Sequence, residues 1–160
     1  MTATEPSAET LTDTQLAGQP VAYWTGLANE ATVAFIRARL AELGCTQPQY
    51  WLLRNLSPHD ISPDGRGMTI PELEQAMSAY LRPGDDLTWE AEPLIGRGWL
   101  TRDAESRLWL TDEGEKARLT IKSHAPAIRT ALHEGIDDAD YVTTVRVLQR
   151  MIVNAGGDLV

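Results

Sequence analysis

The chain of 160 residues carries 23 acidic and 14 basic side chains, which gives a formal charge of −9 at pH 7. This length fits one domain that can bury a useful core, and no apolar run approaches the ~20 residues that a membrane span needs. Residues 1–18 lack the basic segment and apolar core of a secretory signal, and a single cysteine excludes an internal disulfide. We therefore expect a cytoplasmic protein with no membrane segment, in which residues 1–19 form a flexible arm.

Residues 20–43 are expected to form the first long helix, with Pro20 in its first turn and Gly44 at its C-terminal end. One apolar stripe recurs at helical spacing and consists of Trp24, Leu27, Ala28, Ala31, Phe35 and Ala38. A second apolar edge makes the helix apolar on more than one side, so we expect it to lie partly in a homodimer interface. The alternative is a helix packed entirely within a monomer.

A shorter helix is expected over residues 46–56, where Thr46 caps the first turn and the inward face is formed by Tyr50, Leu53 and Leu56. Residues 57–67 follow as a loop rich in proline, glycine and aspartate. These residue types supply turns, and little in this loop is expected to be buried.

The next helix is predicted by a capping box. Thr69 and Glu72 have the spacing at which each side chain reaches the backbone of the other, and Pro71 fits the first turn. Apolar residues at three- and four-residue steps extend this helix to Leu81. The helix ends before Pro83, because the residue before a proline leaves the helical region.

A second helix is expected to begin at Asp85 or Asp86 and to end at Gly98. Residues 99–102 and 107–110 then read as two strands around a turn. The order of helix, turn, helix and two-stranded wing is that of a winged helix-turn-helix.

Two short motifs at the end of this unit resemble those of MarR-type transcription regulators. They are Gly98-Trp99-Leu100-Thr101-Arg102 and Leu110-Thr111-Asp112-Glu113-Gly114. Leu87-Thr88 also falls where the recognition helices of that family carry similar residues. The resemblance extends loosely over residues 20–155, and it implies a dimeric, ligand-responsive regulator that binds double-stranded operator DNA.

After the wing, Thr111 is expected to cap a helix that bends about one turn before Pro126 and ends at Gly135. A last helix begins at Asp137 or Asp138. The fold class is therefore mainly α, a winged helix-turn-helix with a small two-stranded β wing. Residues 46–111 form the winged helix-turn-helix domain, and a helical dimerisation platform is formed by residues 20–45 and 112–155.

The candidate DNA-binding residues lie on this winged helix-turn-helix domain. In the DNA-binding interpretation, Thr88 and Trp89 meet base edges, with thymine methyl groups as apolar targets, while arginines hold phosphates. The full set is Arg66, Thr69, Thr88, Trp89, Arg97, Arg102 and Arg107.

Charge argues against this interpretation. Residues 46–111 contain ten carboxylates and only six basic side chains, although phosphate contacts supply most non-specific affinity. Trp89 and Pro93 stand where the resembled family commonly has basic residues, and the wing is short. Arg102 and Arg107 can instead pair with Asp103 and Glu105 on the wing. The alternative function is a non-DNA-binding protein-interaction or ligand-binding adaptor on the same scaffold.

A small aromatic or anionic effector is the expected ligand. The resemblance implies that it binds between the platform and the winged helix-turn-helix domain, and the residues expected there are Trp24, Tyr50, Trp51 and Arg54. Arg54 suits an anion through a bidentate contact, while core packing is the alternative role of the aromatic side chains.

Other chemistry is not predicted. Cys45 has no basic neighbour in sequence that would lower its pKa, so an idle thiol is favoured over a redox sensor. The three histidines are too scattered for a metal site, and no phosphate-binding loop or nucleophile motif occurs. We expect no enzyme activity, no cofactor and no metal. The sequence leaves open the operator, the effector and whether the outcome is repression or activation.

Overall fold

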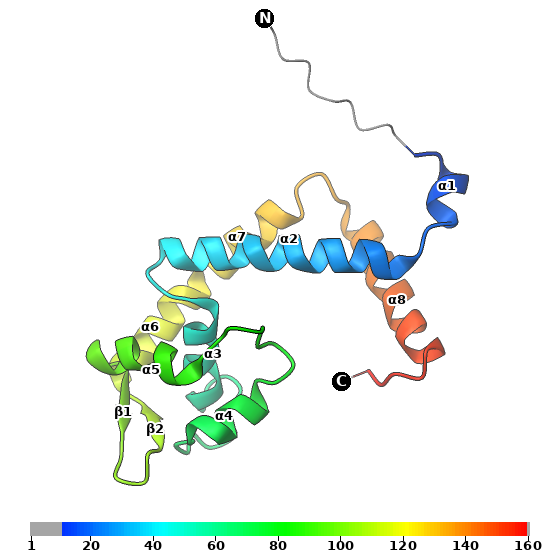
Figure 1. Ribbon diagram of the computed structural model, residues 1–160. Coiled ribbons are helices and arrows are strands. Elements are labelled where there is room, and N and C mark those ends of the chain that lie inside the picture. The colour runs from blue at the N-terminus through cyan, green and yellow to red at the C-terminus, as the bar shows by residue number, and fades with distance from the viewer. Residues whose placement is uncertain (1–10, 160) are drawn as a thin grey trace, which may run out of the picture.

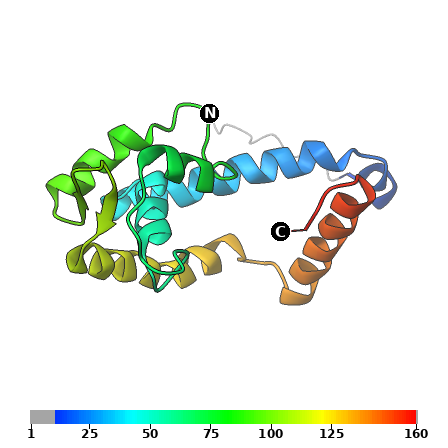
Figure 2. The same cartoon turned by 90° about the horizontal axis from the view of Figure 1, so that it is seen from below.

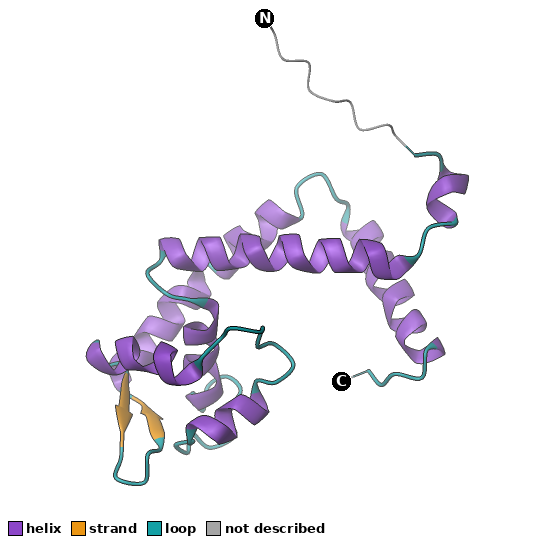
Figure 3. Ribbon diagram, viewed as in Figure 1, coloured by secondary structure: helices purple, strands orange, loops and turns teal. Residues whose placement is uncertain are grey.

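The computed structural model describes residues 11–159, which form a mainly helical chain with one small antiparallel sheet (Figures 1 and 3). In chain order its elements are α1 (Asp13–Ala17), α2 (Val21–Glu42), α3 (Gln47–Leu56), α4 (Ile70–Ala76), α5 (Leu87–Gly96), β1 (Leu100–Arg102), β2 (Leu108–Leu110), α6 (Asp112–Ser123), α7 (Ala125–Leu132) and α8 (Asp138–Asn154). The predicted winged helix-turn-helix is therefore confirmed as α4, α5 and the β1–β2 hairpin.

The helix starts follow the local capping signals. Thr69 and Glu72 form the predicted capping box of α4, and Thr46 forms another with Gln49 at the start of α3. Of the two aspartates considered for α5, Asp86 is the N-cap. Helix α4 ends at Ala76, earlier than Leu81, and the chain reaches Pro83 through turns.

Helix α3 lies at the centre of the winged helix-turn-helix domain, in contact with α2, α4, α5, α6 and β2. Its Leu52, Leu53 and Leu56 are fully buried. Tyr50, expected on the inward face, is half-buried and packs against this core, and Leu52, which was expected to flank that face, is fully buried. The rest of the core comes from the surrounding elements and includes Leu73, Met77, Leu87, Ala91, Leu94, Leu100 and Leu108.

The loop at residues 57–67 is also packed, which corrects the expectation that little of it is buried. Ser57, Ser62 and Gly67 are buried. The indole of Trp109 covers Gly67 so closely that a Cβ there would lie 2.4 Å from the ring. This loop is held because its polar groups find partners on α3 and α6.

Of the platform helices, α2 and α6 contact α3, and α7 contacts α2 and α6. The expectation of one bent helix from Thr111 to Gly135 was wrong: the chain forms two helices, α6 and α7, which meet at His124, two residues before Pro126. Helix α8 stands apart from the winged helix-turn-helix domain in both views (Figures 1 and 2). Part of the expected arm at residues 1–19 is the short helix α1, and residues 1–10 lie outside the described part of the chain. Among the described residues, no helix combines the length and the apolar character of a bilayer span.

Candidate nucleic-acid interface and ligand cavity

The outward surface of α5 carries an indole. Leu87, Ala91 and Leu94 face the core, so the opposite side of the helix faces solvent. Thr88 is exposed there, and Trp89 is 77% exposed. The ten residues of α5 include no lysine or arginine, so a cation at this surface must come from a neighbouring element.

Two arginines of the hairpin lie near α4 and α5, and each is paired with a glutamate. Arg102 contacts Glu92 of α5, and Arg107 contacts Glu72 of α4 at 2.8 Å while donating to the carbonyl oxygen of Gly67 at 2.9 Å. The expected pairing with Asp103 and Glu105 was therefore wrong. The reason is local: a carboxylate oxygen of Asp103 caps the hairpin turn, and the other accepts from the indole of Trp109.

The remaining candidate DNA-binding residues have separate surroundings. The guanidinium of Arg97 donates to the carbonyl oxygen of Gly44 at 2.7 Å and lies over the ring of Trp99. The hydroxyl of Thr69 is used by the capping box of α4. Arg66 is exposed on the loop before α4. The structure thus brings Arg102, Arg107 and Trp89 to one unit, but each of the two arginines is paired with a carboxylate.

A cavity of about 680 Å³ lies where α2 and α3 meet α6, α7 and α8. Three of the four expected ligand residues line it, namely Tyr50, Trp51 and Arg54. Trp24 does not; it is 44% exposed near the start of α2 and its indole donates to Gln19.

The cavity wall is apolar with basic groups. Four further lining residues were not predicted from the sequence. They are Lys122 of α6, Arg129 of α7, His133 directly after α7 and Tyr141 of α8. Among residues 11–159, no aspartate or glutamate lines the cavity. The sequence shows that residues 122 and 129 are basic, but not that they share a site. The turn between α6 and α7 brings both to the cavity wall.

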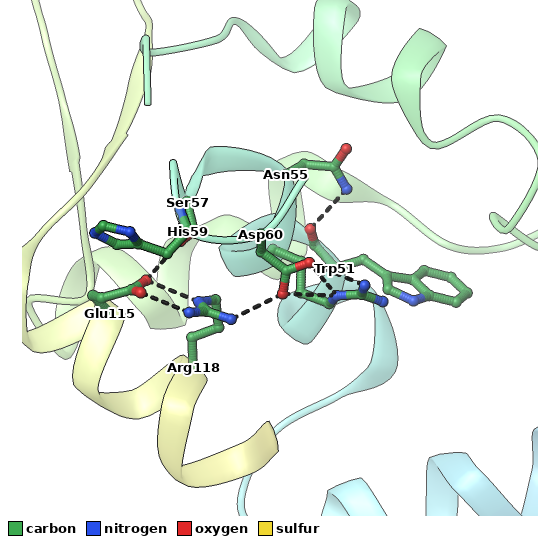
Figure 4. A network of polar contacts seen from close by, with 8 residues as sticks. Trp51, Asn55, Ser57, His59, Asp60, Glu115 and Arg118 are labelled. Carbon is green, nitrogen blue, oxygen red and sulfur yellow. Dashed lines mark hydrogen bonds and ion pairs between the residues drawn. The ribbon is translucent and has the colours of Figure 1, made fainter. Parts of the chain in front are cut away.

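A buried polar network lies behind this cavity (Figure 4). Arg54 donates to Asp60, and Asp60 also accepts from Arg118 at 2.9 Å. The Arg118 side chain is 1% exposed and also donates to Glu115, which accepts from the hydroxyl of Ser57. These contacts hold the packed loop at residues 57–67 between α3 and α6.

The network keeps its acids ionised. Hydrogen bonds from Arg118 lower the pKa of Glu115. Burial works to raise the pKa of Asp60, but the hydrogen bonds and charge of Arg54, with the charge of Arg118, outweigh it and the net pKa is lowered.

Cys45 is buried at the end of α2, and this desolvation raises the pKa of its thiol to about 12. The nearby charge of Arg97 lowers the pKa of this thiol less than burial raises it, so the thiolate that redox chemistry needs is disfavoured at neutral pH. Within residues 11–159, no group of His, Cys, Asp and Glu side chains is arranged to hold a metal ion.

The fold is similar to solved MarR-family structures. A MarR-family protein of Mycobacterium tuberculosis is 20% identical with a TM-score of 0.66, over 82% of this chain and 93% of that one. The reduced form of MarR from E. coli is 18% identical with a TM-score of 0.63, over 84% and 94%. The mycobacterial protein is also known in complex with p-aminosalicylic acid, with a TM-score of 0.61 at 20% identity over 83% and 98%.

No protein-family model matches the sequence, and no curated protein is similar to it in sequence. The likeness therefore rests on the arrangement of the helices and the hairpin. It agrees with the two short motifs that flank the wing, at residues 98–102 and 110–114. The chain has the winged helix-turn-helix fold of the MarR-family transcriptional regulators.

Proposed function

We propose that this protein is a dimeric, DNA-binding transcription regulator whose DNA affinity is changed by a small anionic ligand. The observation that carries the proposal is a complete α4–α5–hairpin unit whose second helix keeps its outer surface open to solvent. In this fold class that helix enters the major groove. Thr88 and Trp89 would meet base edges, and Arg66, Arg97, Arg102 and Arg107 would meet phosphates.

A homodimer is supported by the apolar surface of the platform. Isolated exposed apolar residues are normal, whereas a continuous apolar surface marks an interface. Exposed apolar side chains gather on α2 and α8, and the set includes Val21, Tyr23, Trp24, Leu27, Val142, Val147, Met151, Ile152 and Val153. Two recognition helices related by a twofold axis would enter successive major grooves about 34 Å apart.

The test of DNA binding uses the paired glutamate of α5. We expect the wild-type chain to bind duplex fragments of its own genome at low salt, and Glu92→Gln to bind them more tightly. The substitution removes a carboxylate beside the duplex and releases Arg102 to a phosphate, so the plot of log Kobs against log salt should steepen by about 0.9. Fluorescence anisotropy at several salt concentrations measures both quantities.

The matched control is Glu42→Gln, which opens the exposed Arg39–Glu42 pair on α2 and removes the same charge. It should leave the salt slope unchanged. If neither the wild type nor Glu92→Gln binds any duplex at micromolar protein, the DNA-binding proposal is wrong. The alternative function, a non-DNA-binding adaptor for a protein or a ligand, is then better supported. The specific observation that favours the adaptor is the pairing of both hairpin arginines with glutamates.

The ligand proposal rests on the chemistry of the cavity wall. Aromatic and aliphatic groups there suit a ring, and Lys122 and Arg129 suit a carboxylate. Arg54 also lines the cavity, but its guanidinium is already held by Asp60. Lys122 and Arg129 have no ion pair with any of the described residues, so their charges are available to an anion.

We expect the chain to bind p-aminosalicylate, and Arg129→Gln to weaken that binding about tenfold through loss of one charge-assisted contact. Calorimetric titration measures the affinity. Lys116→Gln is the control, since Lys116 pairs with Glu113 on the outer surface of α6 and does not line the cavity. Equal affinities for all three proteins would contradict this site.

A further inference from the structure

The turn before α5 is attached to the platform by one guanidinium. Arg37, in the C-terminal half of α2, donates from Nη1 and Nη2 to the two carboxylate oxygens of Asp85, at 3.0 and 2.8 Å. Asp85 directly precedes Asp86, the N-cap of α5, and the side chain of Asp85 is 9% exposed. Its Oδ2 also accepts the backbone N–H of Arg82 at 2.8 Å. Arg37 therefore fixes the turn, up to the residue before the N-cap of α5, relative to α2.

The same guanidinium reaches the ligand cavity. The Nε of Arg37 donates to Oε1 of Gln47 at 3.0 Å. Gln47 is buried at the start of α3 and is part of the cavity wall. A guanidinium is planar and rigid, so a change at its Nε edge also changes the direction of the two N–H groups that hold Asp85.

We infer that Arg37 is a positioning residue that couples the ligand cavity to the recognition helix through Gln47 and Asp85. A ligand that contacts the Gln47 amide alters the Gln47–Arg37 contact, and α5 shifts relative to α2. In a dimer this changes the spacing of the two recognition helices and thereby their fit to successive major grooves. This inference rests on the proposed function for the ligand, but the coupling itself is independent of DNA binding.

Hydrogen exchange of the full chain, measured by mass spectrometry, tests this coupling without DNA. In the absence of ligand, peptides covering residues 82–90 should exchange about tenfold faster in Arg37→Gln than in the wild type, because a bidentate charge-assisted contact is lost. Arg39→Gln is the matched control, since Arg39 pairs with Glu42 on the exposed side of the same helix. It should leave exchange at residues 82–90 unchanged.

The double variant separates a direct link from two independent effects. Asp85→Asn alone should raise exchange as Arg37→Gln does, and the pair together should add nothing further. Saturating p-aminosalicylate should then change exchange at residues 82–90 in the wild type and in Arg39→Gln. It should not do so in Arg37→Gln, although calorimetric titration should show that this variant still binds p-aminosalicylate.

If residues 82–90 exchange as slowly in Arg37→Gln as in the wild type, the inference is wrong. It is also wrong if p-aminosalicylate still changes exchange at these residues in that variant. If p-aminosalicylate does not bind, the ligand half of the proposed function fails and the coupling to the cavity fails with it. If the exchange results are as expected but no duplex is bound, the proposed DNA binding fails and the coupling stands.

Discussion

Replacing Arg118 with methionine is expected to lower the free energy of unfolding by about 3 kcal/mol. The side chain of Arg118 is 1% exposed and donates to both Asp60 and Glu115, whose side chains are 11% and 21% exposed. Methionine keeps much of the buried volume, but it leaves Glu115 without its arginine and Asp60 with Arg54 alone, and a partly buried carboxylate that loses its partner is costly. Urea unfolding at pH 7, followed by circular dichroism, gives the difference.

The matched control for this variant is Lys116→Met on the same helix. Lys116 is 71% exposed in its side chain and pairs with Glu113 on the surface, so its loss should change the free energy of unfolding far less than the loss of Arg118 does. A cost for Arg118→Met as small as that of the control would show that the buried network does not stabilise the fold.

The effect of Arg118→Met should also depend on pH. The pKa values of Asp60 and Glu115 are lowered in the folded state. A carboxyl with a lowered pKa contributes stability above its unfolded pKa and loses it as the pH falls through the folded value. Wild-type stability from this source therefore declines in acid below about pH 4, and the difference between the wild type and Arg118→Met should shrink there. A difference that stays constant into acid would contradict this origin.

Gly114→Ala is expected to lower the free energy of unfolding by about 2 kcal/mol. Gly114 is buried in the first turn of α6, where a Cβ would lie 2.1 Å from the carbonyl oxygen of Trp99 and 2.7 Å from Cδ1 of Leu110. Because a backbone carbonyl cannot rotate away as a side chain can, α6 must shift away from the hairpin. Urea unfolding measures the loss.

Gly96→Ala provides the comparison, because Gly96 is also helical and a Cβ there meets nothing within 4 Å. Alanine at this position should stabilise the chain by about 0.5 kcal/mol through a smaller unfolded-state entropy. Equal effects of the two substitutions would mean that the close packing of α6 on the hairpin is not required.

Much of the fold was determined by signals within a few residues of each element. Thr46 and Thr69 form capping boxes because each has its partner three residues later, and the hairpin follows from two short apolar strands around a polar turn. Such signals act locally, so the order of elements and the winged helix-turn-helix could be predicted from the sequence. For the same reason the sequence predicted a bend in the helix near Pro126. It did not predict that one helix ends and another begins there.

The candidate sites depended on contacts between residues far apart in the sequence. Glu72 and Arg107 are 35 residues apart, and Asp60 and Arg118 are 58 apart, so no local pattern could pair them. The sequence predicted arginines near the wing, but not that glutamates of α4 and α5 would hold two of them. It predicted three of the cavity residues, but not Lys122 or Arg129.

The sequence by itself determined the order of the main helices, the capped starts of α3, α4, α5 and α6, and that a two-stranded wing follows the second helix of the unit. Only the tertiary structure decided which charges meet, which cavity carries basic groups, and how α2 holds the start of α5. The physical reason is the separation in sequence between the groups that each interaction joins. Caps, turns and periodic apolar faces are satisfied within a few residues, whereas ion pairs and cavity walls exist only after the core has brought distant helices together.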